Sequence, residues 1–125
     1  MIKAYNLFSM HGDIMAVETL VINQFIAYNN HDSEAFVACF SADFRAWRMP
    51  VEQPSLIGKD NLRTFYQQNR FNNPALRAEL ITRTVMGNKV FDHELIYGIA
   101  EQPIESMAVF EVNDELISKA WFYFP

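Results

Sequence analysis

Three consecutive ionisable residues, Asp92, His93 and Glu94, interrupt an otherwise mostly apolar stretch in the last third of the chain. Carboxylates and imidazoles are the side chains that most often transfer protons in enzymes. The stretch, residues 89–100, is predicted to be a strand, in which successive side chains point to opposite faces. Asp92 and Glu94 would then share one face and could split their pKa values to supply a general acid or base, while His93 could act as a base from the other face. All three are candidate catalytic residues.

The residues alone leave open which of these two faces lines a pocket. His93 shares its face with Phe91 and Leu95, and this apolar company favours burying the histidine face. The carboxylate face also carries Val90 and Ile96. Each candidate has a structural alternative: the carboxylates could form a salt bridge that holds the sheet, and the histidine could be a hydrogen-bonded core or interface residue.

The first half of the chain must position these residues mainly through helices. Apolar residues recur at steps of three and four from about residue 13, which predicts a helix that ends near Asn29, with Asp13 as its N-cap. Residues 1–13 fit either an arm or an earlier start of this helix. A short second helix capped by Asp32 or Ser33 and running through Phe40, a strand over 44–49 and a third helix over 59–69 are expected to follow.

The second half reads as four strands. The apolar pattern after residue 74 predicts strands over 78–86, 89–100, 104–112 and 116–124. Gly87-Asn88 and Asn113-Asp114 are typical hairpin dipeptides. This order predicts an α+β fold, in which a strongly curved antiparallel sheet wraps around helices. Such a sheet encloses a cone, and a cone can hold an internal pocket.

Composition limits the classes of function. The net charge is −5, from 10 basic and 15 acidic residues without a basic cluster, which argues against nucleic-acid binding. No apolar run approaches the roughly 20 residues of a membrane span. The single cysteine, Cys39, lies among apolar residues, which favours a core thiol in a reducing, cytoplasmic setting. No His/Asp/Glu spacing indicates a metal site, and no cofactor is expected.

Aromatic residues make up 14% of the chain, which fits a large core, a large pocket or an interface. Each ring taken singly is more often part of a core than of a pocket wall. The candidates for the pocket wall are Trp47, Tyr28, Tyr66, Phe110 and Trp121.

Three segments, taken in order, resemble the nuclear transport factor 2-like superfamily, which includes SnoaL-like and ketosteroid-isomerase-like proteins. Residues 28–44 (YNNHDSEAF, then FSADF) resemble its helix-turn-helix opening, 57–66 its third helix and 110–122 its terminal hairpin. The similarity extends over residues 14–124 and implies one domain over 14–125 with a cystatin-like cone. It also implies a homodimer paired through the outer sheet face. The superfamily contains both enzymes and binding modules, so it does not by itself assign a function.

The resemblance does not imply a ketosteroid isomerase. Such enzymes use an aspartate base and an oxyanion hole made of a tyrosine and a protonated aspartate. Aligning the motifs places Arg48 at the base, Gln24 at the tyrosine and Ala108 at the second aspartate. A guanidinium stays protonated and cannot act as a base. The alignment instead directs Arg48 into the cone, where it would recognise an anionic or carbonyl oxygen, with Gln24 also beside the substrate.

The same alignment, anchored on the Gly87-Asn88 turn, places Asp92, Glu94 and Ile96 inside the cone. This conflicts with the apolar residues beside His93, which favour burying the histidine face. We expect the alignment to hold, with Arg48 as the partner of the carboxylates across the cone.

Two function classes follow. The first is an enzyme that binds a small apolar carbonyl or hydroxyl compound and performs acid/base chemistry of the isomerase, cyclase, dehydratase or hydrolase type. The second is a non-catalytic ligand-binding or dimerisation module in which the same polar groups are structural.

Overall fold

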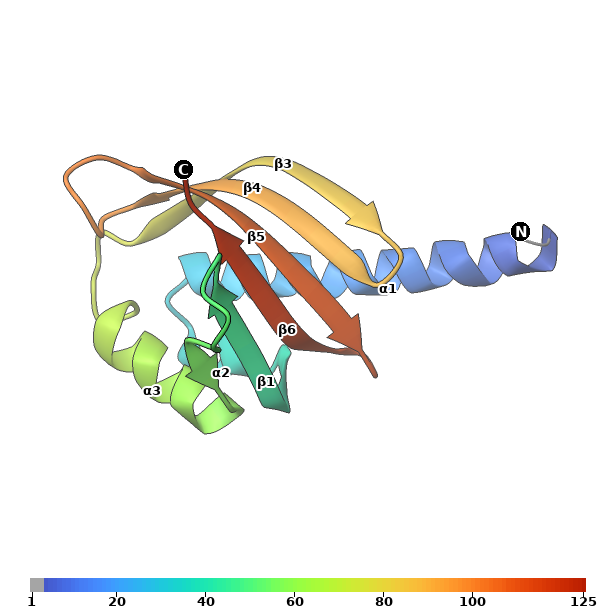
Figure 1. Ribbon diagram of the computed structural model, residues 1–125, viewed down its shortest axis with the longest axis horizontal. Helices are drawn as coiled ribbons and strands as arrows, with labels where there is room; N and C mark the ends of the chain where they lie inside the picture. Colours follow the sequence, from blue (N-terminus) through green and yellow to red (C-terminus); the bar gives the residue numbers. More distant parts are fainter. Residues whose placement is uncertain (1–3) are drawn as a thin grey trace.

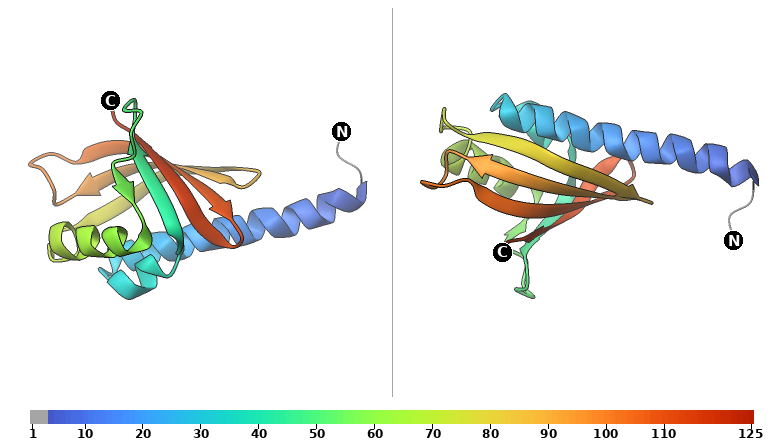
Figure 2. Two further views of the ribbon diagram at one scale, coloured as in Figure 1. Left: turned by 60° about the horizontal axis from the view of Figure 1, so that its bottom comes forward. Right: turned by 90° about the horizontal axis from the view of Figure 1, so that it is seen from above.

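The computed structural model describes residues 4–125, and side chains from residue 16 onward. A six-stranded sheet curves around three helices, and Figures 1 and 2 show the helices on one side of it. The elements are α1 (Ala4–Asn29), α2 (Ser33–Val37), β1 (Phe40–Arg48), β2 (Leu56–Ile57), α3 (Lys59–Asn69), β3 (Arg77–Met86), β4 (Lys89–Tyr97), β5 (Ile104–Asn113) and β6 (Leu116–Tyr123). The α+β fold with a curved sheet is as expected.

The strands are ordered β2-β1-β6-β5-β4-β3. Strands β3 to β6 form the expected antiparallel meander. The prediction of an entirely antiparallel sheet is wrong at one place, because β1 pairs with β6 in parallel. A parallel pair needs a long crossover connection, and the chain between β1 and β6 provides it.

The first helix begins earlier than its apolar pattern indicated. It starts at Ala4, so Asp13 lies inside the helix and is not its N-cap. The helix ends at Asn29, as predicted, and the Asn29 side chain is bonded to both the backbone N–H and the backbone C=O of Ala78 in β3, at 2.7 and 3.0 Å. This double hydrogen bond ties the end of α1 to the edge of the sheet. Within the described residues, no helix combines the length and hydrophobicity needed to cross a bilayer.

Three further element boundaries differ from the prediction. The second helix, with Asp32 as its N-cap, ends at Val37 rather than at Phe40. Strand β1 begins at Phe40 because Phe40 already pairs with Ile117 of β6, ahead of an irregularity in the register. Strand β4 ends at Tyr97, since Gly98 adopts φ +97° and a side chain there would come within 2.4 Å of the Ala75 carbonyl oxygen.

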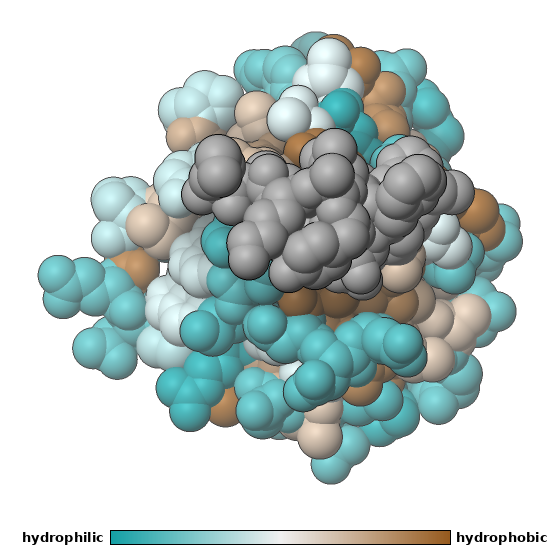
Figure 3. Space-filling model, turned by 90° about the vertical axis from the view of Figure 1, so that its right-hand side faces the viewer, coloured by the Kyte–Doolittle hydropathy of each residue, from teal (hydrophilic) through white to brown (hydrophobic). Residues whose placement is uncertain are grey.

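A cluster of aromatic rings fills the space between α1, α2, α3 and the sheet. Phe36 is at its centre, with ring centroids 4.6 Å from Tyr66, 4.8 Å from Phe40 and 5.2 Å from Phe71. Phe36 and Phe40 are almost completely buried. On the side of the molecule shown in Figure 3, the coloured surface is mostly hydrophilic, with smaller hydrophobic areas between. Phe36, Phe40 and Tyr66 of this cluster also line a cavity.

Candidate active site

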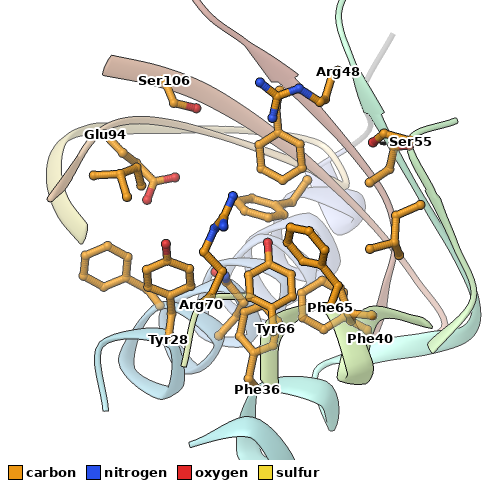
Figure 4. A pocket seen from close by; sticks show the side chains of 18 of the residues that line it. Tyr28, Phe36, Phe40, Arg48, Ser55, Phe65, Tyr66, Arg70, Glu94 and Ser106 are labelled. Carbon is orange, nitrogen blue, oxygen red and sulfur yellow. Dashed lines mark hydrogen bonds between the residues drawn. The ribbon is translucent and has the colours of Figure 1, made fainter. Parts of the chain in front are cut away.

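A cavity of about 540 Å³ lies between the inner face of the sheet and the helices. Figure 4 shows its lining side chains directed toward a common interior. Most of the wall is apolar and much of it aromatic. The aromatic lining consists of Phe25, Tyr28, Phe36, Phe40, Phe44, Phe65, Tyr66, Phe110, Phe122 and Phe124. A cavity of this size and character fits a small, largely apolar molecule.

Glu94 is the one carboxylate among the residues that line this cavity. It lies on β4 and is only 9% exposed. Burial, together with the nearby Asp92 charge, raises the pKa of the Glu94 carboxyl from 4.5 to about 8, although Arg83 opposes the shift. Within the described part of the chain no hydrogen bond or ion pair engages the carboxyl, and its oxygens keep accessible surface toward the cavity, since no fully buried side-chain oxygen there lacks a partner. It is therefore mostly protonated at neutral pH and free to donate a proton into the cavity.

Asp92, two residues earlier on the same face, is already paired. It is completely buried, and Arg83 of β3 donates two hydrogen bonds to its two oxygens, at 2.7 and 2.8 Å. Asp92 does not line the cavity. The expected partner, Arg48, is wrong for Asp92, because Arg83 stands directly opposite it in the β3–β4 register. Counting outward from the Gly87-Asn88 turn would have found this pair.

His93 points away from the cavity. Its Nε2 lies 2.6 Å from Glu105 Oε2 on the outer face of the sheet. The alternation of side chains along β4 places it there, since Asp92 and Glu94 point inward. The candidate catalytic role of His93 is therefore corrected: it cannot reach a molecule in the cavity.

The two tryptophans also lie outside. Trp47 and Trp121 are opposite each other in the β1–β6 register and stack with ring centroids 5.5 Å apart. Their neighbours Ala46, Arg48 and Phe122 line the cavity, so strand alternation directs both indoles to the outer face. Their expected place in the pocket wall is wrong.

Five further candidates line the cavity. Gln24 and Tyr28 come from α1, Arg48 from β1, Tyr66 from α3 and Phe110 from β5. Burial raises the pKa of Tyr66 to about 12 and that of Tyr28 further still, and the Glu94 charge contributes to both shifts. Both phenols therefore keep their protons and offer O–H donors to a bound molecule.

Arg70, which was not among the candidates expected from the sequence, immediately follows α3 and lines the cavity. Figure 4 shows its guanidinium directed into the interior beside the phenols of Tyr28 and Tyr66. Arg70 lies four residues after Tyr66, a spacing that puts two side chains on one helical face, and this signal could have found it. The buried Ser106, opposite Glu94 in the β4–β5 register, also lines the cavity and was missed.

No group of three or more His, Cys, Asp or Glu side chains that could hold a metal ion is present in the part of the chain that the structure describes. The polar groups of the cavity are a protonated carboxyl, two phenols, an amide, hydroxyls and two guanidiniums. Such a set can bind, orient and protonate an organic molecule.

Comparison with known proteins places this geometry in a family. Residues 21–120 match the model of the SnoaL-like domain. No curated protein matches the sequence significantly.

Solved structures share the fold at low sequence identity. A protein from Kribbella flavida that is provisionally named a ketosteroid isomerase superposes with a TM-score of 0.79 at 17% identity, covering 90% of this chain and 80% of that one. A SnoaL-like protein of unknown function from Burkholderia thailandensis gives 0.73 at 18% identity, covering 89% and 95%. An "LEH-like" epoxide hydrolase from Mycobacterium tuberculosis gives 0.72 at 17% identity, covering 90% and 84%.

Proposed function

The chain belongs to the SnoaL-like domain family, and we propose that it is an enzyme that binds a small, largely apolar carbonyl or hydroxyl compound in its cavity and acts on it by proton transfer. The observation that carries this proposal is Glu94, a buried carboxyl that faces the cavity, has no partner among the described residues and has a pKa of about 8. Among the described residues, Asp92 is held by Arg83 and His93 lies outside, so Glu94 alone of the three candidates can reach a bound molecule.

The chemistry follows from the protonation state. At pH 7 the Glu94 carboxyl holds a proton, which it can give to a carbonyl or hydroxyl oxygen of the substrate. The carboxylate left behind is costly in this buried position, so it regains a proton from the substrate or from water, and Glu94 ends each cycle as it began. Arg48 lines the same cavity and supplies a fixed positive charge that stabilises the partial negative charge on the substrate oxygen until the Glu94 proton is transferred to it.

The identity of the polar groups supports a reaction other than ketosteroid isomerisation. The position that would carry the aspartate base carries Arg48, and the position of the oxyanion-hole tyrosine carries Gln24. Ala108, at the position of the protonated aspartate, is fully buried and offers no proton. Substrate protonation by Glu94 of β4 would therefore be a different reaction in a cavity of the same fold.

The test compares the wild-type chain with Glu94→Gln, which keeps the shape of the side chain and removes its proton transfer. Both proteins are incubated with a panel of small apolar ketones, β-hydroxy ketones and epoxides, and products are followed by mass spectrometry. We expect turnover of at least one class, lowered on the order of 100-fold or more in Glu94→Gln. His93→Gln, which changes a group outside the cavity, is the matched control.

Two results would overturn the proposal. The first is equal turnover by Glu94→Gln and wild type. The second is a Glu94 carboxyl that titrates near its ordinary pKa when followed by carbon-13 NMR. Ligand binding that is retained in both proteins, without turnover of any of the three classes, would instead favour the non-catalytic binding module.

We also propose that two copies pair through the outer face of the sheet. This face carries the stacked Trp47 and Trp121 together with the buried Val109 and the half-buried Phe91 and Leu95. Apolar side chains of this number on an outer sheet face are typical of an interface. Light scattering at micromolar concentration should give the mass of a dimer, and Trp121→Lys should give a monomer. A wild-type monomer under these conditions would contradict the proposal.

A further inference from the structure

Two arginines line a cavity whose wall is mostly apolar. Arg48 comes from β1, and Arg70 follows α3. Figure 4 shows both guanidiniums directed toward the interior from different walls. Among the described residues, neither has a carboxylate within ion-pair distance, whereas Arg63 and Arg83 are both paired with acids. The cavity is therefore locally positive in a chain whose net charge is −5.

Arg70 is held in place but keeps most of its donors. Its guanidinium stands over the Phe65 ring, 5.0 Å from the centroid, and a stacked guanidinium has its plane and its fork fixed by the ring. Within the described residues its single hydrogen bond runs from Nη1 to the Asn69 carbonyl oxygen, at 2.8 Å. A guanidinium has five N–H donors, so Arg70 can still form a bidentate pair of hydrogen bonds with a planar anion.

Arg70 and Glu94 line the same cavity from different elements. Glu94 lies on β4, and Arg70 immediately follows α3. Figure 4 shows the phenols of Tyr28 and Tyr66 directed into the same interior. Among the described residues no ion pair joins Arg70 to Glu94, so both groups remain available to a bound molecule. A molecule that contacts both must carry two polar groups.

We propose that the substrate of the Glu94 site is an amphipathic carboxylic acid whose carboxylate is bound by Arg70, while its carbonyl or hydroxyl oxygen is presented to Glu94. This inference rests on the proposed function and deepens it by naming the substrate class. The aromatic lining holds the hydrocarbon body between the two ends. A carboxylate should bind here more tightly than a neutral oxygen. Its two oxygens can accept a bidentate pair of hydrogen bonds from the guanidinium, and its charge neutralises the positive charge of Arg70.

Arg70 is thereby a residue that determines substrate specificity, whereas Arg48 has a different role. Arg48 is exposed at the cavity wall and stands over Phe124, 4.5 Å from the ring centroid. It remains the group that stabilises negative charge on the reacting oxygen, as in the proposed function. Arg70 acts at the other end of the molecule, where no bond changes.

The experiment uses a matched pair of probes, 2-naphthylacetate and its neutral amide, 2-naphthylacetamide. The two have nearly the same shape and differ in charge at pH 7. Isothermal titration calorimetry of the wild-type chain should show the carboxylate binding on the order of 10- to 100-fold more tightly than the amide. The difference should shrink at high salt, since part of it is electrostatic. Equal affinities, or no binding of the carboxylate at millimolar concentration, would overturn the proposal without recourse to any variant.

Two variants assign the preference to one residue. Arg70→Met keeps most of the apolar stem and should reduce the carboxylate-to-amide ratio to near one, while leaving amide binding almost unchanged. Arg77→Gln is the matched control, because Arg77 is also stacked on an aromatic ring, at 4.2 Å from the Tyr97 centroid, but is not part of the cavity lining. An Arg70→Met protein that keeps the wild-type ratio would overturn the assignment.

This test is separate from the test of Glu94. Carboxylate preference together with unchanged turnover in Glu94→Gln would remove the acid/base role and leave the Arg70 site in place. Glu94-dependent turnover of neutral compounds without carboxylate preference would do the reverse.

Discussion

Asp92 and Glu94 lie two residues apart on the same face of β4, and both are buried, yet their surroundings differ in one respect. Asp92 has a two-pronged partner in Arg83, whereas Glu94 has no partner in the described part of the chain and faces the cavity. The pairing satisfies a buried charge and makes Asp92 structural. Burial, together with the Asp92 charge, keeps a proton on Glu94, and the position of Glu94 in the cavity lining makes that proton available for chemistry.

Burial alone therefore does not distinguish a structural carboxylate from a functional one. What separates them is whether a neighbouring strand supplies a cation in register. Arg83 stands opposite Asp92 on β3, while the β3 residue opposite Glu94 is Leu80. The same pair of strands thus makes one stable ion pair and one carboxyl with a displaced pKa. Four substitutions test this comparison.

The largest effect is expected from Arg83→Met, which leaves the Asp92 charge buried and alone. Breaking a buried pair in this way costs about 3–5 kcal/mol, to be measured as the free energy of unfolding in urea at pH 7. Adding Asp92→Asn to the same chain should recover most of the loss, because no charge then remains unpaired. A loss below about 1 kcal/mol in the single variant would show that the pair does not separate Asp92 from Glu94.

Glu94→Gln should act in the opposite direction, and its effect depends on pH. The folded-state pKa of about 8 lies above the ordinary 4.5, so the folded chain holds a proton that the unfolded chain releases between these values. Wild-type stability therefore falls as the pH rises through this window, by up to about 1.4 kcal/mol per pH unit from this group.

The Gln variant lacks this titration and should be more stable than wild type at pH 8, with the difference vanishing toward pH 4.5. Unfolding at pH 5, 6.5 and 8 measures it, and Glu105→Gln on the outer face is the control. Identical slopes for wild type and Glu94→Gln would mean that Glu94 is not held protonated by burial.

Arg83→Lys keeps the positive charge opposite Asp92 but removes the planar guanidinium with its paired N–H donors. Lysine offers a point charge, so one of the two short hydrogen bonds to Asp92 is lost. The expected cost is about 1.5 kcal/mol in the same urea measurement, which lies between wild type and Arg83→Met. A Lys variant as unstable as the Met variant would show that geometry, rather than charge, holds Asp92.

His93→Gln should have the smallest effect. His93 lies between the two carboxylates in sequence but contacts Glu105 on the outer face, where both side chains are partly exposed. Exposed pairs of this kind contribute under about 1 kcal/mol. Thermal unfolding should therefore change little, and binding of 2-naphthylacetate should be unchanged. A loss of binding would contradict the orientation of β4.

Much of the arrangement could be predicted from neighbouring residues. The Gly87-Asn88 dipeptide predicts the β3–β4 hairpin, and the strand period puts Asp92 and Glu94 on one face. The three signature segments predict the SnoaL-like family, which the match over residues 21–120 confirms. The same turn also predicts that Arg83 stands opposite Asp92, an implication that the sequence analysis did not draw.

Other features could not be predicted because they depend on how distant segments pack. The apolar neighbours of His93 favoured its burial, but the outer sheet face also carries apolar side chains, including the stacked Trp47 and Trp121. The entry of Arg70 into the cavity depends on how the end of α3 packs against α1 and the sheet.

Turn chemistry and periodicity are properties of adjacent residues, so they set the order of the elements, the hairpin registers and the grouping of residues on strand faces. Packing across the fold set which face of the sheet is concave, that Arg70 enters the cavity, and that Glu94 is buried with no partner among the described residues. The physical reason is that a pKa and an ion pair depend on distances and solvent exclusion across the whole fold, and the curvature of the sheet sets both.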